Sequence, residues 1–318
     1  LFKRFKLEEV LIIIFPFLII SGPAIPDITA FIIITIFIYK NLKYKNYNWG
    51  KNYWVHIFLL LNFWFILTSF FSYNFNSSIT DSLIFIRFIL FIMALKYFID
   101  LNKNIQRYIL YSILLAIIFV TLDTLFQFYN YSSELGFQSD FFGIKESGLY
   151  GRLNGPFKDY IPGSYLSRFY FFIFIIMFTK NNIFEKKYLF TFFLLLLSIA
   201  LSTIYFTGEP MALCTTLLGL TIIFIYIKKF RKFIINIILI SLTIILINKY
   251  FHPFYNDYKI INNSSAHEGL IIERSYQCND NPSKICKKIF KKQPSILTTL
   301  NNFKNSPYGE IYITAFEI

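Results

Sequence analysis

Nine apolar segments follow one another along this chain of 318 residues, separated by short polar stretches. Most of them approach the roughly 20 residues that a helix needs to cross a lipid bilayer. A water-soluble domain of this length could not bury a composition that is 56% hydrophobic and includes 41 Phe. The pattern therefore predicts an all-α fold, a polytopic transmembrane helix bundle with about nine spans here and more in the full chain. The segments cover approximately residues 9–22, 27–39, 53–71, 80–99, 107–128, 163–179, 187–206, 210–227 and 232–248.

Basic residues alternate between the two sides of these segments. They gather in every second connection, at Lys3, Arg4 and Lys6, at Lys40, Lys43, Lys45 and Lys51, at Lys96, Lys103 and Arg107, at Lys180, Lys186 and Lys187, and at Lys228, Lys229, Arg231 and Lys232. The short connections 21–26, 72–79 and 207–209 hold none. Since cytoplasmic loops collect Lys and Arg, the N-terminus is predicted to be cytoplasmic. The net charge of +13 is thereby explained without a nucleic-acid partner.

Two parts of the chain differ from the apolar pattern. Residues 1–250 are predicted to form the transmembrane domain, with a long outer loop at 129–162, and residues 251–318 a polar outer segment that we expect to be truncated. Cys278 and Cys286 in this segment could form a disulfide in an oxidising compartment or remain free thiols.

No His or Cys pair has the spacing of metal ligands, so no metal is predicted. At the other end of the chain, 21–26 is a hinge that either joins two tight spans or breaks one helix.

The outer loop is where polar groups and flexible backbone gather. Half of the 12 glycines fall between Gly136 and Gly163, together with Pro156 and Pro162. Within it, Arg152 stands among Gly151, Asn154 and Gly155, and glycines let a backbone approach a ligand closely. This environment predicts a binding role for Arg152.

Charged residues inside or beside the apolar segments are costly and are usually functional. On the predicted topology, Arg87, Asp123, Arg168, Glu209 and Arg152 all fall in the outer third of the membrane or just above it. Such a one-sided pocket suits a substrate in the outer leaflet with an anionic head, because arginine pairs bidentately with phosphate oxygens. We interpret it as a site for a lipid-linked phosphate or diphosphate.

Four of these charges also have a purely structural interpretation. Arg87 and Asp123 could form an ion pair between neighbouring helices. Arg168 could extend to the membrane interface from its place near a helix end. Glu209 could favour the N-terminus of its own helix, which has Pro210 in its first turn.

Several motifs, taken in order, resemble the O-antigen ligase and polymerase superfamily. The stretch Gly151-Arg-Leu-Asn-Gly-Pro-Phe-Lys-Asp, with the helix that opens Gly163-Ser-Tyr-Leu-Ser-Arg, resembles the arginine–glycine–phenylalanine loop of that family. Asp123-Thr-Leu-Phe-Gln-Phe, Thr207-Gly-Glu-Pro-Met-Ala and Ile86-Arg-Phe fit it as well. The resemblance covers the chain from about residue 8 onward.

The resemblance implies a metal-independent membrane glycosyltransferase without a cofactor, in the bacterial inner membrane, whose active site faces the periplasm. Its donor would be a glycan linked to undecaprenyl diphosphate, and its acceptor lipid A-core for a ligase or another glycan for a polymerase. Arg152, and less securely Arg87, would engage the diphosphate, with Asn154 and Gly155 shaping the loop. Asp123 or Glu209 would orient an arginine.

The chain departs from the family at two points. The family has an arginine in the later helix where this chain has Pro210, so either Arg168 or Lys158 substitutes or this copy of the protein is impaired. The family's catalytic histidine lies in the large periplasmic segment. Neither His252 nor His267 has its sequence context, so the catalytic residue is unknown and expected beyond Ile318.

Two other functional classes remain open on the sequence. A transporter of lipid-linked glycans would place charges through the whole membrane depth, and the predicted inner half holds few. A purely structural membrane protein would not need the glycine-rich loop around Arg152.

Overall fold

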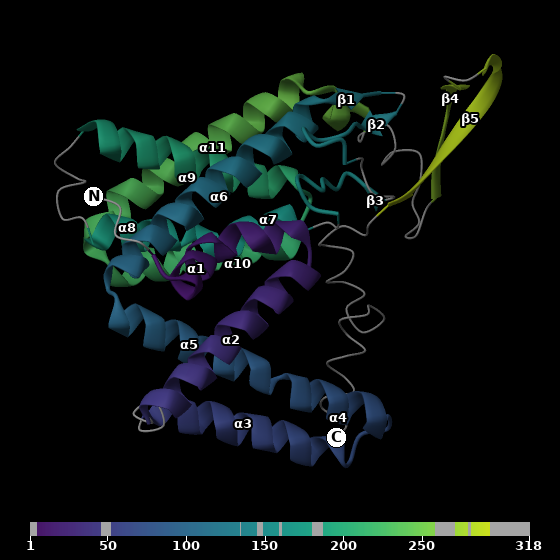
Figure 1. Cartoon of the computed structure of the whole chain (residues 1–318). Coiled ribbons are helices and arrows are strands. Elements are labelled where there is room, and N and C mark those ends of the chain that lie inside the picture. Colours follow the sequence, from purple (N-terminus) through teal and green to yellow (C-terminus); the bar gives the residue numbers. More distant parts are fainter. Residues whose placement is uncertain are drawn as a thin grey trace. The chain divides into compact units, whose positions relative to one another are not determined.

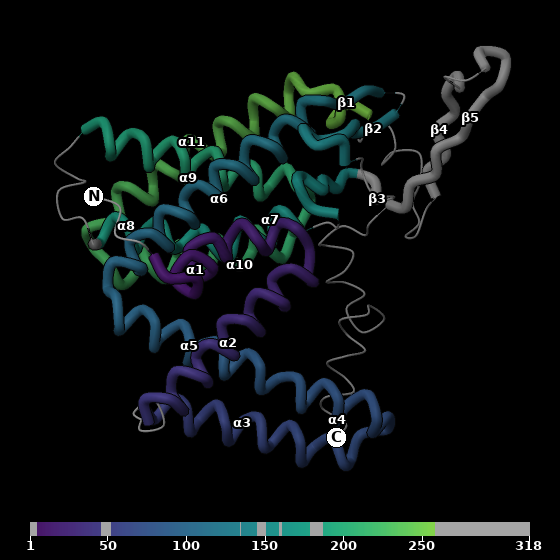
Figure 2. The backbone as a smooth tube through the Cα atoms, viewed as in Figure 1, coloured from purple at the N-terminus to yellow at the C-terminus, as the bar shows by residue number. Residues whose placement is uncertain are grey.

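The computed structural model describes residues 5–45, 52–133, 135–144, 149–158, 161–179 and 187–257, and the backbone of 271–278 and 281–292. The described chain is mostly helical, which confirms the predicted helical class (Figure 1). It packs into two compact units, Leu1–Ala116 and Ile117–Ile318, with the boundary inside one helix. Figure 2 follows the same backbone as a smooth tube, coloured along the sequence. His267 lies outside the described residues.

The first unit contains six helical elements and the beginning of a seventh. They are α1 (Leu7–Leu18), the 3-10 turn η1 (Ile19–Ser21), α2 (Ala24–Tyr44), α3 (Tyr53–Ser69), α4 (Phe75–Ile84), α5 (Ile86–Leu101) and the start of α6 (Asn104–Tyr129). The hinge at 21–26 therefore joins two helices. Gly22 turns the chain there with a φ of 101°, a conformation that glycine adopts without strain.

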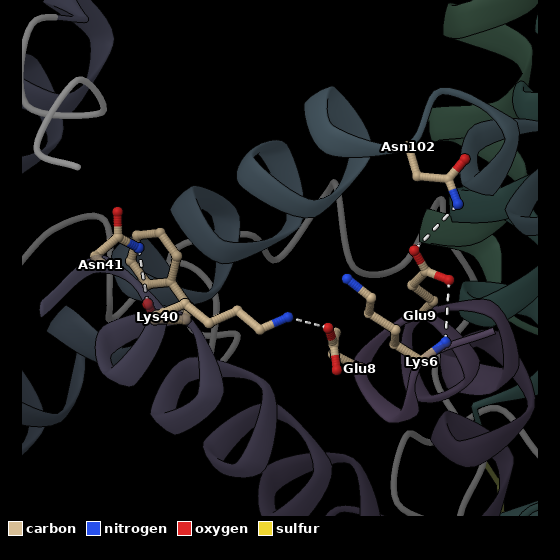
Figure 3. A network of polar contacts seen from close by, with 7 residues as sticks. Lys6, Glu8, Glu9, Lys40, Asn41 and Asn102 are labelled. Carbon is tan, nitrogen blue, oxygen red and sulfur yellow. Dashed lines mark hydrogen bonds and ion pairs between the residues drawn. The ribbon is translucent and has the colours of Figure 1, made fainter. Parts of the chain in front are cut away.

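Contacts between their far ends show that α1 and α2 form a helical hairpin. Glu8 at the start of α1 forms an ion pair with Lys40 near the end of α2, as Figure 3 shows. In the same network Glu9 accepts hydrogen bonds from the Asn102 side chain (3.0 Å) and from the Lys6 backbone (3.1 Å). These polar contacts join one end of α1 to the ends of α2 and α5.

A single apolar cluster holds the first unit together. Its members come from helices α1, α2, α3, α5 and α6, and each is almost completely removed from solvent. They are Ile12, Ile33, Phe37, Val55, Ile89, Met93, Ala94, Phe98 and Ile105. Arg87 lies away from this cluster, about half exposed, and forms an ion pair with Asp27 of α2 (3.0 Å).

The second unit contains the rest of α6, five further helices and the strands. These are β1 (Tyr131–Ser132), β2 (Gly136–Phe137), β3 (Leu149–Tyr150), α7 (Pro162–Tyr170), α8 (Phe172–Thr179), α9 (Lys187–Phe206), α10 (Pro210–Tyr226), η3 (Lys228–Phe230), α11 (Arg231–Phe251), β4 (Ile271–Cys278) and β5 (Asn281–Lys292). Helix α9 packs against α7, α10 and α11. Its contact with α11 uses small polar residues, since Ser241 Oγ donates to the Ser198 carbonyl (3.0 Å) and Ser202 Oγ to the Ser241 carbonyl (3.3 Å).

The strands were not predicted from the sequence. β1 and β2 pair in antiparallel fashion directly after α6. In the polar segment β4 and β5 form an antiparallel pair, and β3 adds to β5 in parallel. The register pairs Cys286 with Tyr276 and Cys278 with Asn281. The side chains of the two cysteines lie outside the described residues, so the disulfide stays a prediction.

Five helical segments of the described chain are long and apolar enough to cross a membrane, namely Ala24–Tyr44, Phe75–Leu101, Asn104–Tyr129, Lys187–Phe206 and Lys228–Phe251. Three shorter apolar helices, Tyr53–Ser69, Pro162–Phe178 and Pro210–Tyr226, coincide with other predicted segments. These helices are compatible with a multi-pass membrane protein. The count of nine spans and the orientation in the membrane stay predictions.

Candidate functional site

The ends of five helices of the second unit meet around residues 151–158. The C-terminal ends of α6, α9 and α11 and the N-terminal ends of α7 and α10 all contribute side chains or backbone to this region. In Figure 1 the β1–β2 hairpin lies at the same end of α6. The basic residues at Lys187 and 228–232 stand at the opposite ends of α9, α10 and α11. The distribution of basic residues assigned these connecting segments to one side of the membrane, and in the structure they lie together at one end of this unit.

Gln127 of α6 fixes the backbone of the Arg152 loop, by which we mean residues 151–158. Its Oε1 accepts hydrogen bonds from the backbone N–H groups of Asn154 (2.9 Å) and Gly155 (2.8 Å). Its Nε2 donates to the carbonyl of Gln138 (3.3 Å). The Gln127 side chain is fully buried, so these bonds are shielded from water. One amide thus joins both parts of the outer loop to α6.

The sequence analysis did not single out Gln127, although the residue belongs to a stretch that carried the resemblance. A signal was present, because an amide side chain within an apolar helix must find partners. What the sequence could not supply was the identity of those partners, which lie 11 to 28 residues away along the chain.

Close backbone packing holds the Arg152 loop against the turn between α9 and α10. The Leu153 N–H donates to the carbonyl of Thr207 (3.4 Å). Gly208 has a φ of +72°, and a Cβ atom there would come within 2.4 Å of the Gly151 carbonyl oxygen. Gly155, with a φ of +51°, leaves no room for a Cβ atom beside Thr124 Oγ1 (2.4 Å). The sequence predicted that glycines here let the backbone approach a ligand, and the structure shows Gly208 and Gly155 serving close packing of the loop backbone within the protein.

Glu209 connects this loop to the start of α7. Its Oε1 accepts from the Gly163 N–H (2.8 Å), and its Oε2 accepts from the Ser164 N–H (3.0 Å) and hydroxyl. A carboxylate at a helix N-terminus satisfies N–H groups that have no partner within the helix. Glu209 is the N-cap residue of its own helix, α10, as its place in the sequence indicates, but its side chain makes no cap hydrogen bond there and instead caps α7.

Arg152 lies close enough to Glu209 for the guanidinium to favour the ionised carboxyl. Burial acts in the opposite direction and is the largest effect. It outweighs the guanidinium and the hydrogen bonds from Ser164 and Gly163, so the pKa of Glu209 is raised above its ordinary value. The predicted supporting role of Glu209, to orient an arginine, is consistent with this proximity. The pair places an arginine and a carboxylate side by side at the gathered helix ends.

Replacing Glu209 with glutamine tests the cap. The amide oxygen of Glu209→Gln can still accept from one N–H group, but its NH₂ is a donor and faces the other. We expect the free energy of unfolding of the second unit to fall by roughly 1–3 kcal/mol, the cost of one buried donor without an acceptor. Chemical denaturation of the purified protein in micelles measures it. An Asp100→Asn variant, which alters an exposed carboxylate of the first unit, is the control and should keep the wild-type stability. Equal stability of Glu209→Gln and wild type would contradict the assignment.

The other predicted site residues are distributed as follows. Asn154 is buried and donates through Nδ2 to the Lys158 carbonyl (3.3 Å), while the Lys158 side chain is exposed. Arg168 is exposed in the last turn of α7. Asp123 accepts a hydrogen bond from the Phe141 N–H (3.2 Å) within the outer loop. The structure thus brings Arg152, Asn154, Gly155 and Glu209 together.

Arg87 belongs to the other unit. The proposed ion pair of Arg87 with Asp123 is wrong, because the carboxylate that Arg87 contacts is that of Asp27. Helix pairing decides this partner, and the sequence alone does not reveal which helices pack together. The residues that the candidate site brings together therefore all belong to the second unit.

His252 is occupied by structural contacts. Its Nε2 lies 3.0 Å from the Phe128 carbonyl, and its Nδ1 accepts from the Phe254 N–H (3.3 Å). Since Nδ1 accepts, Nε2 carries the proton and donates, so the ring is neutral. Burial lowers the pKa of His252, in agreement with this state. The ring also stacks on Phe128 at 4.2 Å. Both ring nitrogens are engaged, which argues against a role as a general base.

Among the described residues, no group of three His, Cys, Asp or Glu side chains could hold a metal ion. No protein-family profile, curated protein or solved structure matches the chain.

Proposed function

We propose that this protein is an O-antigen ligase-like membrane glycosyltransferase that transfers a polysaccharide from undecaprenyl diphosphate to lipid A-core at the periplasmic face of the inner membrane. The observation that carries the proposal is the position of Arg152. It stands in a loop fastened by Gln127 and Thr207, next to Glu209, where the ends of five helices gather.

Transfer from a lipid diphosphate needs a group that stabilises the negative charge developing on the leaving diphosphate. A guanidinium held in place by a fixed backbone can do so without reorganising during the reaction. The charge of Arg152 acts on Glu209, and in this proposal Glu209 orients the guanidinium. In this proposal Arg152 binds the diphosphate, while Gln127, Gly155 and Glu209 position it.

Two further roles in the proposed reaction are a second cation at the diphosphate and a base for the acceptor. Arg168 and Lys158, both exposed in the same unit, are candidates to replace the cation that the family has at the position of Pro210. Deprotonation of the acceptor hydroxyl requires a base. We assign no described residue to it, because the ring nitrogens of His252 are already engaged.

A second candidate, in the same superfamily, is an O-antigen polymerase that joins lipid-linked repeat units. It would use the same diphosphate site, so the Arg152 loop favours neither activity. A transporter of lipid-linked glycans is a third class, with the same ligand and no chemistry. The gathering of the polar residues at one end of the second unit favours an enzyme at one membrane face over a transport path.

Complementation separates these candidates. The full-length reading frame containing this chain is expressed in two bacterial hosts that make O-antigen precursor, one without its ligase and one without its polymerase. We expect the lipid A-attached ladder to return on a lipopolysaccharide gel in the ligase-deficient host. A ladder only in the polymerase-deficient host would support the polymerase. No ladder in either host, with the protein present in the membrane, would contradict both enzymatic proposals.

A further inference from the structure

Two buried carboxyl groups face one another where the outer loop meets α6. Asp123 of α6 is 5% exposed, and Asp140, in the turn after β2, is 3% exposed. The two side chains lie within hydrogen-bonding reach of each other. Each Oδ1 accepts one backbone N–H, Asp123 from Phe141 (3.2 Å) and Asp140 from Ile144 (2.6 Å). The Oδ2 atoms of both are shielded from solvent, and neither has a donor among the described residues.

Two ionised carboxylates in this arrangement would repel each other strongly, because burial removes the water that would screen them. Asp140 is the charged side chain that acts on Asp123, and no ion pair among the described residues involves either carboxyl. Aromatic contacts join the same two segments, since Phe119 of α6 contacts Phe142 (5.7 Å) and Phe126 of α6 contacts Phe141 (6.0 Å). A single proton between the carboxyls would remove one charge and supply the missing donor.

We propose that Asp123 and Asp140 share one proton, and that this hydrogen bond fastens residues 138–144 to α6. Gln127, one helical turn further along α6, holds the same segment because its Nε2 donates to the Gln138 carbonyl. Its Oε1 also accepts from the N–H groups of the Arg152 loop. The shared proton is thus one of two attachments of the outer loop to α6.

The attachment depends on pH in a defined direction. The fastened loop holds one proton that the released loop loses when both carboxyls reach water and ionise. Raising the pH therefore favours release, and lowering it favours the fastened loop. From about pH 4, the ordinary pKa of a free carboxyl, the equilibrium constant for opening rises about tenfold for each pH unit until the fastened pair itself loses its proton, and above that pH it is constant. This inference does not depend on the proposed transfer reaction.

Hydrogen exchange of residues 138–144, measured by mass spectrometry on the full-length protein in lipid nanodiscs, tests the proposal. The exchange rates are corrected for the intrinsic effect of pH. For the wild type we expect protection to fall by about tenfold per pH unit above about pH 4 and to level off once the fastened pair loses its proton. The Asp140→Asn variant should show a flat profile, because its amide NH₂ replaces the proton as donor to Asp123. Asp123→Asn should behave in the same way.

The control is Asp100→Asn, which changes an exposed carboxylate of the first unit and should keep the wild-type exchange profile. A wild-type profile as flat as that of both asparagine variants would overturn the proposal. So would restored protection at alkaline pH on adding calcium or sodium, with loss on chelation or dilution, since the pair would then hold a cation. Because the readout is exchange, it is independent of whether glycan transfer is ever observed.

Discussion

Gln127→Leu is expected to release the Arg152 loop from α6. Leucine fits the volume of the buried site but accepts no hydrogen bond, so the N–H groups of Asn154 and Gly155 and the carbonyl of Gln138 lose their partner. The N–H groups of Asn154 and Gly155 are buried, and losing an acceptor costs each of them roughly 1–3 kcal/mol, so we expect the free energy of unfolding of the second unit to fall by about 2–6 kcal/mol. Denaturation in micelles gives the stability, and hydrogen exchange at 151–158 should rise with it.

The matched control is Gln106→Leu. Gln106 is exposed on the same helix, so its replacement should change stability by little. If Gln127→Leu and Gln106→Leu had the same stability and the same exchange at 151–158, Gln127 would not be the residue that holds the loop.

Arg152→Ala is expected to lower glycan transfer by about 100- to 1000-fold, the usual effect of removing one group that stabilises charge in the transition state. The protein should still reach the membrane, because Arg152 is only partly buried and the loop backbone is held by Gln127. Arg152→Lys should keep the charge but lose bidentate pairing with phosphate oxygens, and should lie between alanine and wild type. Initial rates of transfer in membranes, divided by protein abundance, measure both.

Arg107→Ala is the control for this series. Arg107 is an exposed arginine near the opposite end of α6, so its replacement removes the same charge from a different place. Equal loss in Arg107→Ala and Arg152→Ala would indicate a general effect of charge. Full activity of Arg152→Ala would remove Arg152 from the diphosphate site.

The sequence predicted the helical class well, and it predicted which segments gather at one end. The reason is that both depend on strong local signals. Long apolar runs can only be helices in a bilayer, and the alternating basic residues assign the connections to two sides. The loops around Arg152, Gly208 and His252, predicted to share a side, do meet in the second unit.

The contacts within the site could not be predicted in the same way. That Glu209 caps α7 depends on how the turn before α10 packs against Gly163, 46 residues earlier in the chain. The predicted partner of Arg87 was wrong for a similar reason, because the actual partner, Asp27, lies 60 residues away along the chain on α2. Short strands such as β1 and β2 are set by pairing after the fold forms, and two residues carry too little pattern to predict them.

The most direct test of the account is transfer by the purified full-length protein in proteoliposomes, with an undecaprenyl diphosphate-linked glycan as donor and lipid A-core as acceptor. We predict that the wild type forms the lipid A-linked product without added metal or cofactor, and that Arg152→Ala of equal folding does not. Transfer at the same rate by both proteins, or none by a folded wild type given both substrates, would contradict the proposed diphosphate site.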